Sequence, residues 1–144
     1  MRPAAVISKG DLRLVRAARE VRTRAHAPYS GFKVGAALRT RDGKQFVGCN
    51  VENAALGGSI CAERGAVMQA VAAGMRPGDL EAVAVYTRAA RVTPPCGMCL
   101  QVLVEFGRDP VVLLAGPGRV RRTRLLALYP EPFTDYPTPR RRGA

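Results

Sequence analysis

The hydrophobic residues of the chain follow two different periods, and this pattern predicts a protein built from helices and strands. Over residues 8–26, apolar residues recur every three to four positions, which is the period of an amphipathic helix. Ser8 or Asp11 is a suitable N-cap for this helix, and Pro28 is expected to stop it. The first predicted element is therefore a helix with one face on the core.

Further helices are predicted from their boundaries. Residues 61–73 are rich in alanine, and Gly74 follows them as a suitable C-terminal cap. Residues 96–106 are preceded by two prolines, which are favoured at the entrance of a helix. A last helical turn is predicted over residues 125–128.

Four segments have the composition of strands. Residues 32–38 and 45–48 flank Asp42-Gly43, a pair typical of a hairpin turn in which both central residues have positive φ. Residues 81–87 and 111–115 are short apolar runs. Strands that alternate with helices predict an α/β fold in which helices cover a sheet.

The length and composition are those of one globular domain. The chain has 144 residues, of which 47% are hydrophobic and 24% are charged. We expect a single domain over residues 1–136 and a flexible, basic tail over residues 137–144. The sequence has no apolar run of the length of a transmembrane helix, and its N-terminal residues lack the apolar stretch of a secretory signal. The expected location is the cytoplasm, with no membrane partner.

The formal net charge of +12 lies largely in arginine clusters. One cluster is in the first predicted helix, a second spans residues 119–124 and a third spans residues 140–142. Such clusters can bind nucleic acid. However, no aromatic residues alternate with them as stacking platforms would. We therefore favour a solvated, arginine-rich surface and expect no nucleic-acid partner.

Four cysteines carry the candidate chemistry: Cys49, Cys61, Cys96 and Cys99. In a reducing compartment, a Cys-x-x-Cys pair such as Cys96 and Cys99 is typical of a metal site or a redox site. A thioredoxin-like redox pair would leave Cys61 unexplained. Cys61 and Cys96 each open a predicted helix, whose positive N-terminal end favours the thiolate form that binds zinc.

Three cysteine ligands, Cys61, Cys96 and Cys99, would leave the fourth tetrahedral position open for water, as in a catalytic zinc site. Glu63, two residues after Cys61, is placed to take and return a proton. Cys49 as a fourth ligand would make a closed structural site, but such sites usually pair their cysteines in two short-spaced knuckles. We therefore expect Cys49 to be a buried thiol.

The chain shares four stretches, in the same order, with one enzyme family: Ala-Pro-Tyr-Ser-Gly-Phe-Lys-Val-Gly-Ala-Ala-Leu (27–38), Gly-Cys-Asn-Val-Glu-Asn-Ala (48–54), Ile-Cys-Ala-Glu-Arg (60–64) and Pro-Cys-Gly-Met-Cys (95–99). A zinc ligand two residues before a glutamate, followed by Pro-Cys-x-x-Cys, is the signature of zinc deaminases. From about residue 27 to residue 133, the chain resembles the small cytidine deaminases that bind zinc through three cysteines.

The resemblance implies roles for residues around this signature. Asn50 and Glu52 would hold the ribose 3′-hydroxyl of a nucleoside, and Phe32 would line the base pocket. The backbone N–H of Ala62 would bind the base, and Phe133 would reach the site of a neighbouring subunit. An internal nucleotide of a polymer has no free 3′-hydroxyl, so this set favours a free nucleoside.

Arg64 matches an arginine that hydrogen-bonds the zinc thiolates in the family. A guanidinium there would moderate the negative charge of a zinc ion with three thiolates. The chain departs from the family at two positions, with Leu100 in place of an arginine and Leu56 in place of an aromatic residue. The missing arginine would make the sulfurs more electron-rich and the zinc water less acidic, and both departures bear on the choice of substrate.

The expected fold is a three-layer α/β/α sandwich with a mixed sheet of about five strands. As the resemblance implies, it would assemble into a homotetramer with one zinc ion per chain. The expected activity is hydrolytic deamination of free cytidine or deoxycytidine to uridine or deoxyuridine, with release of ammonia, in pyrimidine salvage. Two alternatives remain open. One is a deaminase of a modified cytidine or of a cytosine-nucleoside antibiotic such as blasticidin S, and the other is a non-catalytic basic zinc module that binds nucleic acid.

Overall fold

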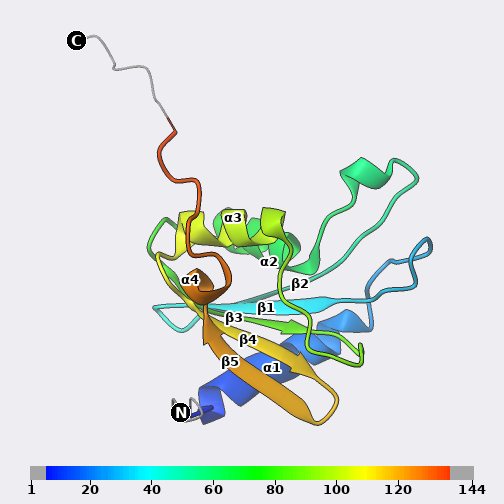
Figure 1. The fold of residues 1–144 in the computed structure, drawn as a ribbon, viewed down its shortest axis with the longest axis horizontal. Helices are drawn as coiled ribbons and strands as arrows, with labels where there is room; N and C mark the ends of the chain where they lie inside the picture. Colours follow the sequence, from blue (N-terminus) through cyan, green and yellow to red (C-terminus); the bar gives the residue numbers. More distant parts are fainter. Residues whose placement is uncertain (1–5, 137–144) are drawn as a thin grey trace.

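The computed structural model describes residues 6–136, which form the helices and strands of Figure 1. The helices are α1 (Lys9–Arg22), α2 (Ala62–Ala72), α3 (Gly97–Phe106) and α4 (Leu125–Leu128), and a 3₁₀ turn, η1, spans Leu56–Gly58. The strands are β1 (Gly35–Thr40), β2 (Gln45–Cys49), β3 (Leu80–Tyr86), β4 (Val111–Gly116) and β5 (Arg119–Arg124).

The strands form one mixed sheet in the order β2-β1-β3-β4-β5. β3 and β4 are parallel and are connected through α3, while the other neighbours are antiparallel. α1 covers one face of the sheet, and α2 and α3 cover the other (Figure 1). The structure thus confirms the predicted three-layer α/β/α sandwich with a mixed five-stranded sheet.

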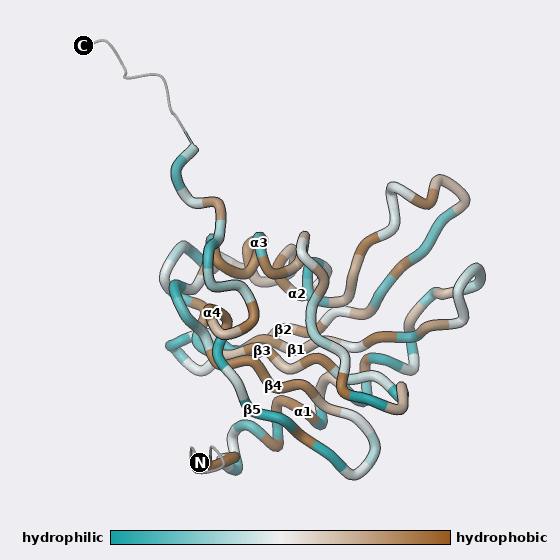
Figure 2. The backbone as a smooth tube through the Cα atoms, viewed as in Figure 1, coloured by the Kyte–Doolittle hydropathy of each residue, from teal (hydrophilic) through white to brown (hydrophobic). Residues whose placement is uncertain are grey.

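The two faces of the sheet carry side chains of different size. Toward α1 the strands present mostly alanine, whereas toward α2 and α3 they present leucine and valine, such as Leu38, Val83 and Leu114. The small side chains let α1 lie very close to β1, since a Cβ added to Gly35 would be 1.9 Å from the Ala18 carbonyl oxygen. Figure 2 shows the central strands as the hydrophobic interior.

Two element ends differ from the predicted ones by three residues or more. The first helix ends at Arg22, because the backbone N–H of His26 donates to the Asn50 carbonyl (3.0 Å) instead of continuing the helix. The first strand begins at Gly35, because the N–H of Val34 donates to the Asn50 side chain (2.8 Å) instead of to another strand. In both places a distant loop replaces the local hydrogen bonds.

The hairpin between β1 and β2 forms at the predicted turn but with different geometry. Only Gly43 has a positive φ, 86°, and no described residue other than glycine has one, so the expectation of two such residues is wrong. The Gly43 N–H donates to the Thr40 carbonyl (2.9 Å), as in a type I turn followed by a left-handed glycine.

Residues 119–124, expected above as a solvated basic cluster, form the edge strand β5. The strand appears hydrophilic in Figure 2. Arg122 Nε lies 3.4 Å from the buried carboxylate of Asp11, and Arg124 Nε lies 3.1 Å from the partly exposed carboxylate of Asp109. β5 pairs with the preceding strand β4 across the turn at Pro117 and Gly118, although its arginine-rich residues contain no apolar run that would predict a strand.

Asp11 connects α1 to the sheet. Its carboxylate accepts from the N–H of Ser8 (3.1 Å) in a capping box, so Ser8 is the N-cap. It also lies 3.5 Å from Arg39 and 3.4 Å from Arg122. Burial opposes ionisation of this carboxyl, but the hydrogen bonds from Ser8 and the two guanidinium charges outweigh it and lower the pKa of Asp11.

No described helix is both long and apolar enough to cross a membrane. The single-domain boundary at residue 136 stays a prediction, and the predicted tail, residues 137–144, lies outside the described residues.

Candidate zinc and nucleoside site

Two helix N-termini position the three cysteines that the sequence predicts as zinc ligands. Cys61 is the N-cap residue of α2, and Cys96 is the N-cap residue of α3. Cys99 lies in the first turn of α3, three residues after Cys96, so both can turn toward one point. Unpaired N–H groups at a helix N-terminus favour negative charge, and therefore thiolates.

Gly48 of β2 sets how closely the start of α2 approaches the sheet. A Cβ added to Gly48 would lie 2.3 Å from the Ala62 carbonyl oxygen and 2.4 Å from the Ala66 nitrogen, both backbone atoms. Only glycine allows this approach, which fixes the first turn of α2 next to Cys61. A glycine inside a strand often marks such a close backbone contact, although no site role is predicted for Gly48 above.

The sulfur atoms of Cys61, Cys96 and Cys99 all lie within 4.8 Å of one another. The sulfurs of Cys61 and Cys96 are 3.8 Å apart. Cys99 is buried, Cys61 is half-buried and Cys96 is exposed. Among the residues that the structure describes, Cys49 and His26 do not belong to this group. Cys49 is half-buried and not the buried thiol expected above. Three converging sulfurs form a donor set that suits zinc.

The thiols of Cys61 and Cys99 differ in how readily they ionise. A hydrogen bond from the Cys99 thiol, together with the Arg64 guanidinium, lowers the pKa of Cys61 to about 5. The hydrogen bond to Cys61 and burial in turn raise the pKa of Cys99. A divalent cation among the sulfurs would offset the accumulated negative charge that keeps Cys99 protonated.

Arg64 lies beside this group. Its Nη2 is 3.8 Å from the Cys61 sulfur and donates to the Ser59 carbonyl (3.1 Å). Its Nε is buried and has no hydrogen-bond partner among the described residues. A buried donor next to sulfurs fits a zinc ion with three thiolates, which carries net negative charge. The residues present therefore fit zinc.

Glu63 lies in the first turn of α2, two residues after Cys61, and its side chain is buried, with 4% of its surface exposed. Burial raises the pKa of its carboxyl group, and the negative charge of Cys61 raises it further. A carboxyl group with a raised pKa is suited to bind and release a proton near neutral pH.

The family model of the cytidine and deoxycytidylate deaminase zinc-binding region matches residues 8–115. The chain belongs to this deaminase family. A cytidine deaminase of Sporosarcina psychrophila is 40% identical over 124 residues, which cover 85% of this chain and 90% of that protein. The crystal structure of cytidine deaminase from Burkholderia pseudomallei aligns with a TM-score of 0.82 and 49% identity, over 85% of this chain and 98% of that one. A blasticidin-S deaminase of Bacillus cereus is 33% identical over 135 residues, 89% of this chain and 95% of that protein.

Three of the residues that the resemblance assigns to the nucleoside, Phe32, Asn50 and Glu52, lie in two loops of this deaminase. These loops, residues 23–34 and 50–60, are joined by backbone hydrogen bonds. Asn50 accepts from the Val34 N–H (2.8 Å) and donates to the Phe32 carbonyl (2.8 Å). Asn50 therefore also shapes the loop that carries Phe32, a role that the sequence did not indicate.

Glu52 holds the same loop from its other side. Its carboxylate accepts from the N–H groups of Tyr29 (2.9 Å) and Ser30 (3.1 Å) and from the Ser30 hydroxyl. These hydrogen bonds, that from the Ser30 hydroxyl above all, hold the pKa of Glu52 below its usual value. Glu52 is thus an ionised acceptor at the start of the second loop.

Phe133 lies on the C-terminal segment, which α3 anchors. Gln101 of α3 donates to the Phe133 carbonyl (2.7 Å) and accepts from its N–H (3.2 Å). Phe133 is 60% exposed. Gln101 is therefore a positioning residue that no motif indicated, and the role of Phe133 in a neighbouring subunit stays a prediction.

The two departures from the deaminase family have different surroundings. Leu100 is buried in the core beneath α3, in the same cluster as Val67 and Leu103. With leucine at position 100, the guanidinium beside the sulfurs is that of Arg64. Leu56, at η1, is 64% exposed.

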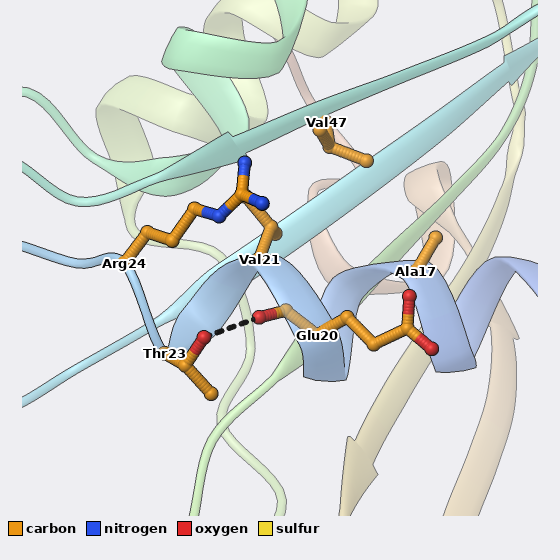
Figure 3. Close-up of a pocket in the computed structure, with 6 residues that line it drawn as sticks. All are labelled: Ala17, Glu20, Val21, Thr23, Arg24 and Val47. Atoms are coloured by element: carbon orange, nitrogen blue, oxygen red, sulfur yellow. Dashed lines mark hydrogen bonds between the residues drawn. The ribbon is translucent and has the colours of Figure 1, made fainter.

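A hollow between α1 and β2 lies outside the predicted site (Figure 3). Thr23 donates to the Glu20 carbonyl (2.8 Å) at its edge, where α1 ends. None of its lining residues is a predicted zinc or nucleoside residue: Ala17, Glu20, Val21, Thr23, Arg24 and Val47.

Proposed function

We propose that the chain catalyses hydrolytic deamination of free cytidine or deoxycytidine, giving uridine or deoxyuridine and ammonia, as a step of pyrimidine salvage in the cytoplasm. The observation that carries the proposal is the convergence of three thiols beside the buried carboxyl of Glu63, in a chain of the deaminase family. Identities of 40% and 49% to cytidine deaminases over most of the chain support this substrate class.

Cys61, Cys96 and Cys99 would hold the zinc ion, and zinc, when bound, supplies a Lewis acid that makes water a better nucleophile. The carboxylate of Glu63 accepts a proton as water adds to C4 of the cytosine ring. It passes this proton to N3 of the ring, then takes the proton of the new C4 hydroxyl and gives it to the amino group. The C4–N bond then breaks, the C4 carbonyl of uridine forms and ammonia leaves.

The nucleoside would be held by the joined loops and by the start of α2. A carboxylate has about four acceptor positions. Tyr29 and Ser30 supply three donors to Glu52, which leaves a position for the ribose 3′-hydroxyl. Asn50 would be its partner there, Phe32 would line the base pocket, and the N–H of Ala62 would bind the base.

The active form in this proposal is a homotetramer in which Phe133 reaches a neighbouring subunit's site. Both loops extend from the layered body on the same side (Figure 1). They expose apolar side chains, namely Tyr29, Phe32, Val51 and Leu56. An apolar surface of this kind is typical of a subunit interface.

A cytosine-nucleoside antibiotic is the second candidate substrate. The 33% identity to a blasticidin-S deaminase over 89% of the chain supports it. Membership of the deaminase family favours either enzyme over a non-catalytic zinc module.

A panel of nucleosides tests the proposal. The zinc-loaded protein is assayed by ultraviolet absorbance and ammonia release with cytidine, deoxycytidine, blasticidin S and cytidine 3′-monophosphate. We expect the highest kcat/KM for the first two and a much lower value for the 3′-monophosphate, whose 3′-hydroxyl is blocked. A higher kcat/KM for blasticidin S would favour the antibiotic, and no ammonia from any compound would contradict the enzyme proposal.

A further inference from the structure

A groove lies on the α1 face of the sheet, between α1 and the turn that connects β4 to β5. Its volume is about 820 Å³. Five of its lining residues are arginines and one is a glutamate, Glu20. The arginines come from α1, from the segment after β3 and from the start of β5: Arg16, Arg19, Arg22, Arg88 and Arg119.

The charges of these five arginines are not neutralised within the described residues, because none of the five takes part in an ion pair there. Arg22 donates to the Lys33 carbonyl (2.9 Å), and Arg119 donates to backbone carbonyls. Because carbonyl groups are neutral, these hydrogen bonds do not neutralise the two guanidinium charges. The charge of Arg122, which is also on β5, is by contrast neutralised, because its guanidinium lies beside the Asp11 carboxylate.

The helix dipole explains only part of this arrangement. Arg19 and Arg22 lie in the last turn of α1, where cations are favourable. Arg16 lies one turn earlier, and Arg88 and Arg119 lie outside the helix. Since like charges that share a surface repel one another, five arginines from three segments around one groove indicate a bound anion.

We propose that this groove binds the phosphate chain of a small polyphosphate, such as a nucleoside triphosphate. Guanidinium groups bind phosphate oxygens through paired hydrogen bonds, and several of them can surround a chain of phosphates. The groove is also lined by apolar side chains, among them Leu12, Val15 and Val120, which offer a surface to the base or sugar of a nucleotide.

Two other occupants fit less well. Single-stranded RNA binds by stacking successive bases on exposed aromatic rings, whereas Tyr86, the aromatic residue of the groove, is buried. A second copy of the chain offers few anions, since 11 acidic residues stand against 23 basic ones. Several of these carboxylates, such as Asp11 and Asp109, already pair with arginines.

Binding of inorganic triphosphate to the zinc-loaded, full-length protein, measured by calorimetry, tests the proposal. The Arg19→Gln/Arg88→Gln double variant removes two charges from the groove. The Arg13→Gln/Arg76→Gln double variant removes two exposed charges outside it. We expect one triphosphate per chain and at least about tenfold weaker binding for the groove variant, since it loses charge-assisted hydrogen bonds, against less than about threefold for the control. Tighter binding of adenosine triphosphate than of inorganic triphosphate would show that part of the groove binds the nucleoside.

Three outcomes would overturn the proposal: no binding by the parent protein, equal weakening in both double variants, or groove-dependent binding of single-stranded RNA that is tighter than that of triphosphate. Equal weakening would show only general attraction by a basic surface. Cytidine deamination without triphosphate should be unchanged in both variants, so the result is independent of the proposed enzyme activity.

Discussion

The zinc cluster and the nucleoside loops of this deaminase are built in different ways. The cluster lies on the first turns of α2 and α3, which rest on the larger-residue face of the sheet, and its sulfurs lie within 4.8 Å of one another. The loops at residues 23–34 and 50–60 extend from the body, hold each other through Asn50 and Glu52, and expose apolar side chains. The three sulfurs (the metal half) therefore come together within one chain, whereas the loops (the loop half) leave an apolar surface exposed, which in our proposal faces another subunit.

This difference predicts how changes in each half affect the enzyme. A change in the metal half should abolish zinc binding or chemistry while the remaining chain stays folded. A change in the loop half should act on substrate affinity and leave zinc in place.

The largest effect is expected from the cysteines. Cys96→Ser should remove most of the zinc and reduce deamination below detection, because one sulfur of the three-ligand group is lost. Cys49→Ser is the matched control and should keep zinc, because Cys49 lies outside the group. Zinc content by mass spectrometry and circular dichroism for folding check both variants. Zinc loss in Cys49→Ser together with retention in Cys96→Ser would mean a different ligand set.

The convergence of Cys61, Cys96 and Cys99 could be predicted from the sequence because the chemistry of each segment is local, while their role as zinc ligands stays a prediction. Cys61 and Glu63 are two residues apart, and Cys96 and Cys99 are three apart, so the residue types and spacings carry the information. The layered fold could also be predicted, since hydrophobic periods and glycine boundaries locate most of the elements.

The remaining features depend on partners that are distant in sequence. The Arg122 side chain of β5 lies beside Asp11, 111 residues away, and the arginine-rich sequence of the strand does not indicate this ion pair. The loop role of Glu52 depends on Ser30, and that of Gln101 depends on Phe133. Each of these contacts exists only once the chain has folded, and single-sequence patterns do not contain them.

The next effect is expected at Glu63. Glu63→Gln keeps the shape of the side chain but cannot transfer protons, so kcat should fall by at least about 10²–10⁴-fold, or roughly 3–5 kcal/mol of barrier. Zinc content and nucleoside binding should be unchanged. Steady-state kinetics and metal analysis measure these quantities, with the exposed Glu105→Gln as a control that keeps full activity. Loss of zinc in Glu63→Gln would make Glu63 a support of the metal group instead of a proton carrier.

Variants of two glycines distinguish the contact of the sheet with α2 from its contact with α1. Gly48→Ala and Gly35→Ala each place a Cβ against backbone atoms, of α2 and α1 respectively, that cannot rotate away. Both should lower the free energy of unfolding by about 1–3 kcal/mol, the usual range for an overpacked core. Only Gly48→Ala should also weaken zinc binding in a chelator competition, because it displaces the first turn of α2. Equal zinc affinity in the two variants would mean that the strand contact does not position Cys61.

The smallest effect is expected in the loop half, at Glu52. Glu52→Gln replaces one acceptor oxygen by a donor that opposes the N–H and hydroxyl groups of Tyr29 and Ser30, so KM for cytidine should rise about tenfold, or ~1.4 kcal/mol, with zinc retained. Ser30→Ala is the control, since it removes a loop donor but leaves the position for the ribose hydroxyl, and its KM should change less.

The pH dependence of the same variant tests whether the carboxylate acts in its ionised form. Hydrogen bonds, first that from the Ser30 hydroxyl, lower the pKa of Glu52 from 4.5, so the folded site keeps its charge below the pH at which a free glutamate is half protonated. The stabilisation from this charge is fully present above pH 4.5. It is lost only as the pH falls through the lower pKa that Glu52 has in the folded protein. The ratio of the KM of Glu52→Gln to that of the parent should therefore stay constant from neutral pH down past 4.5 and then decline. Using the ratio cancels protonation of the cytosine ring, which affects both proteins equally. A ratio that already declines above pH 4.5 would show that the loop hydrogen bonds do not hold Glu52 ionised.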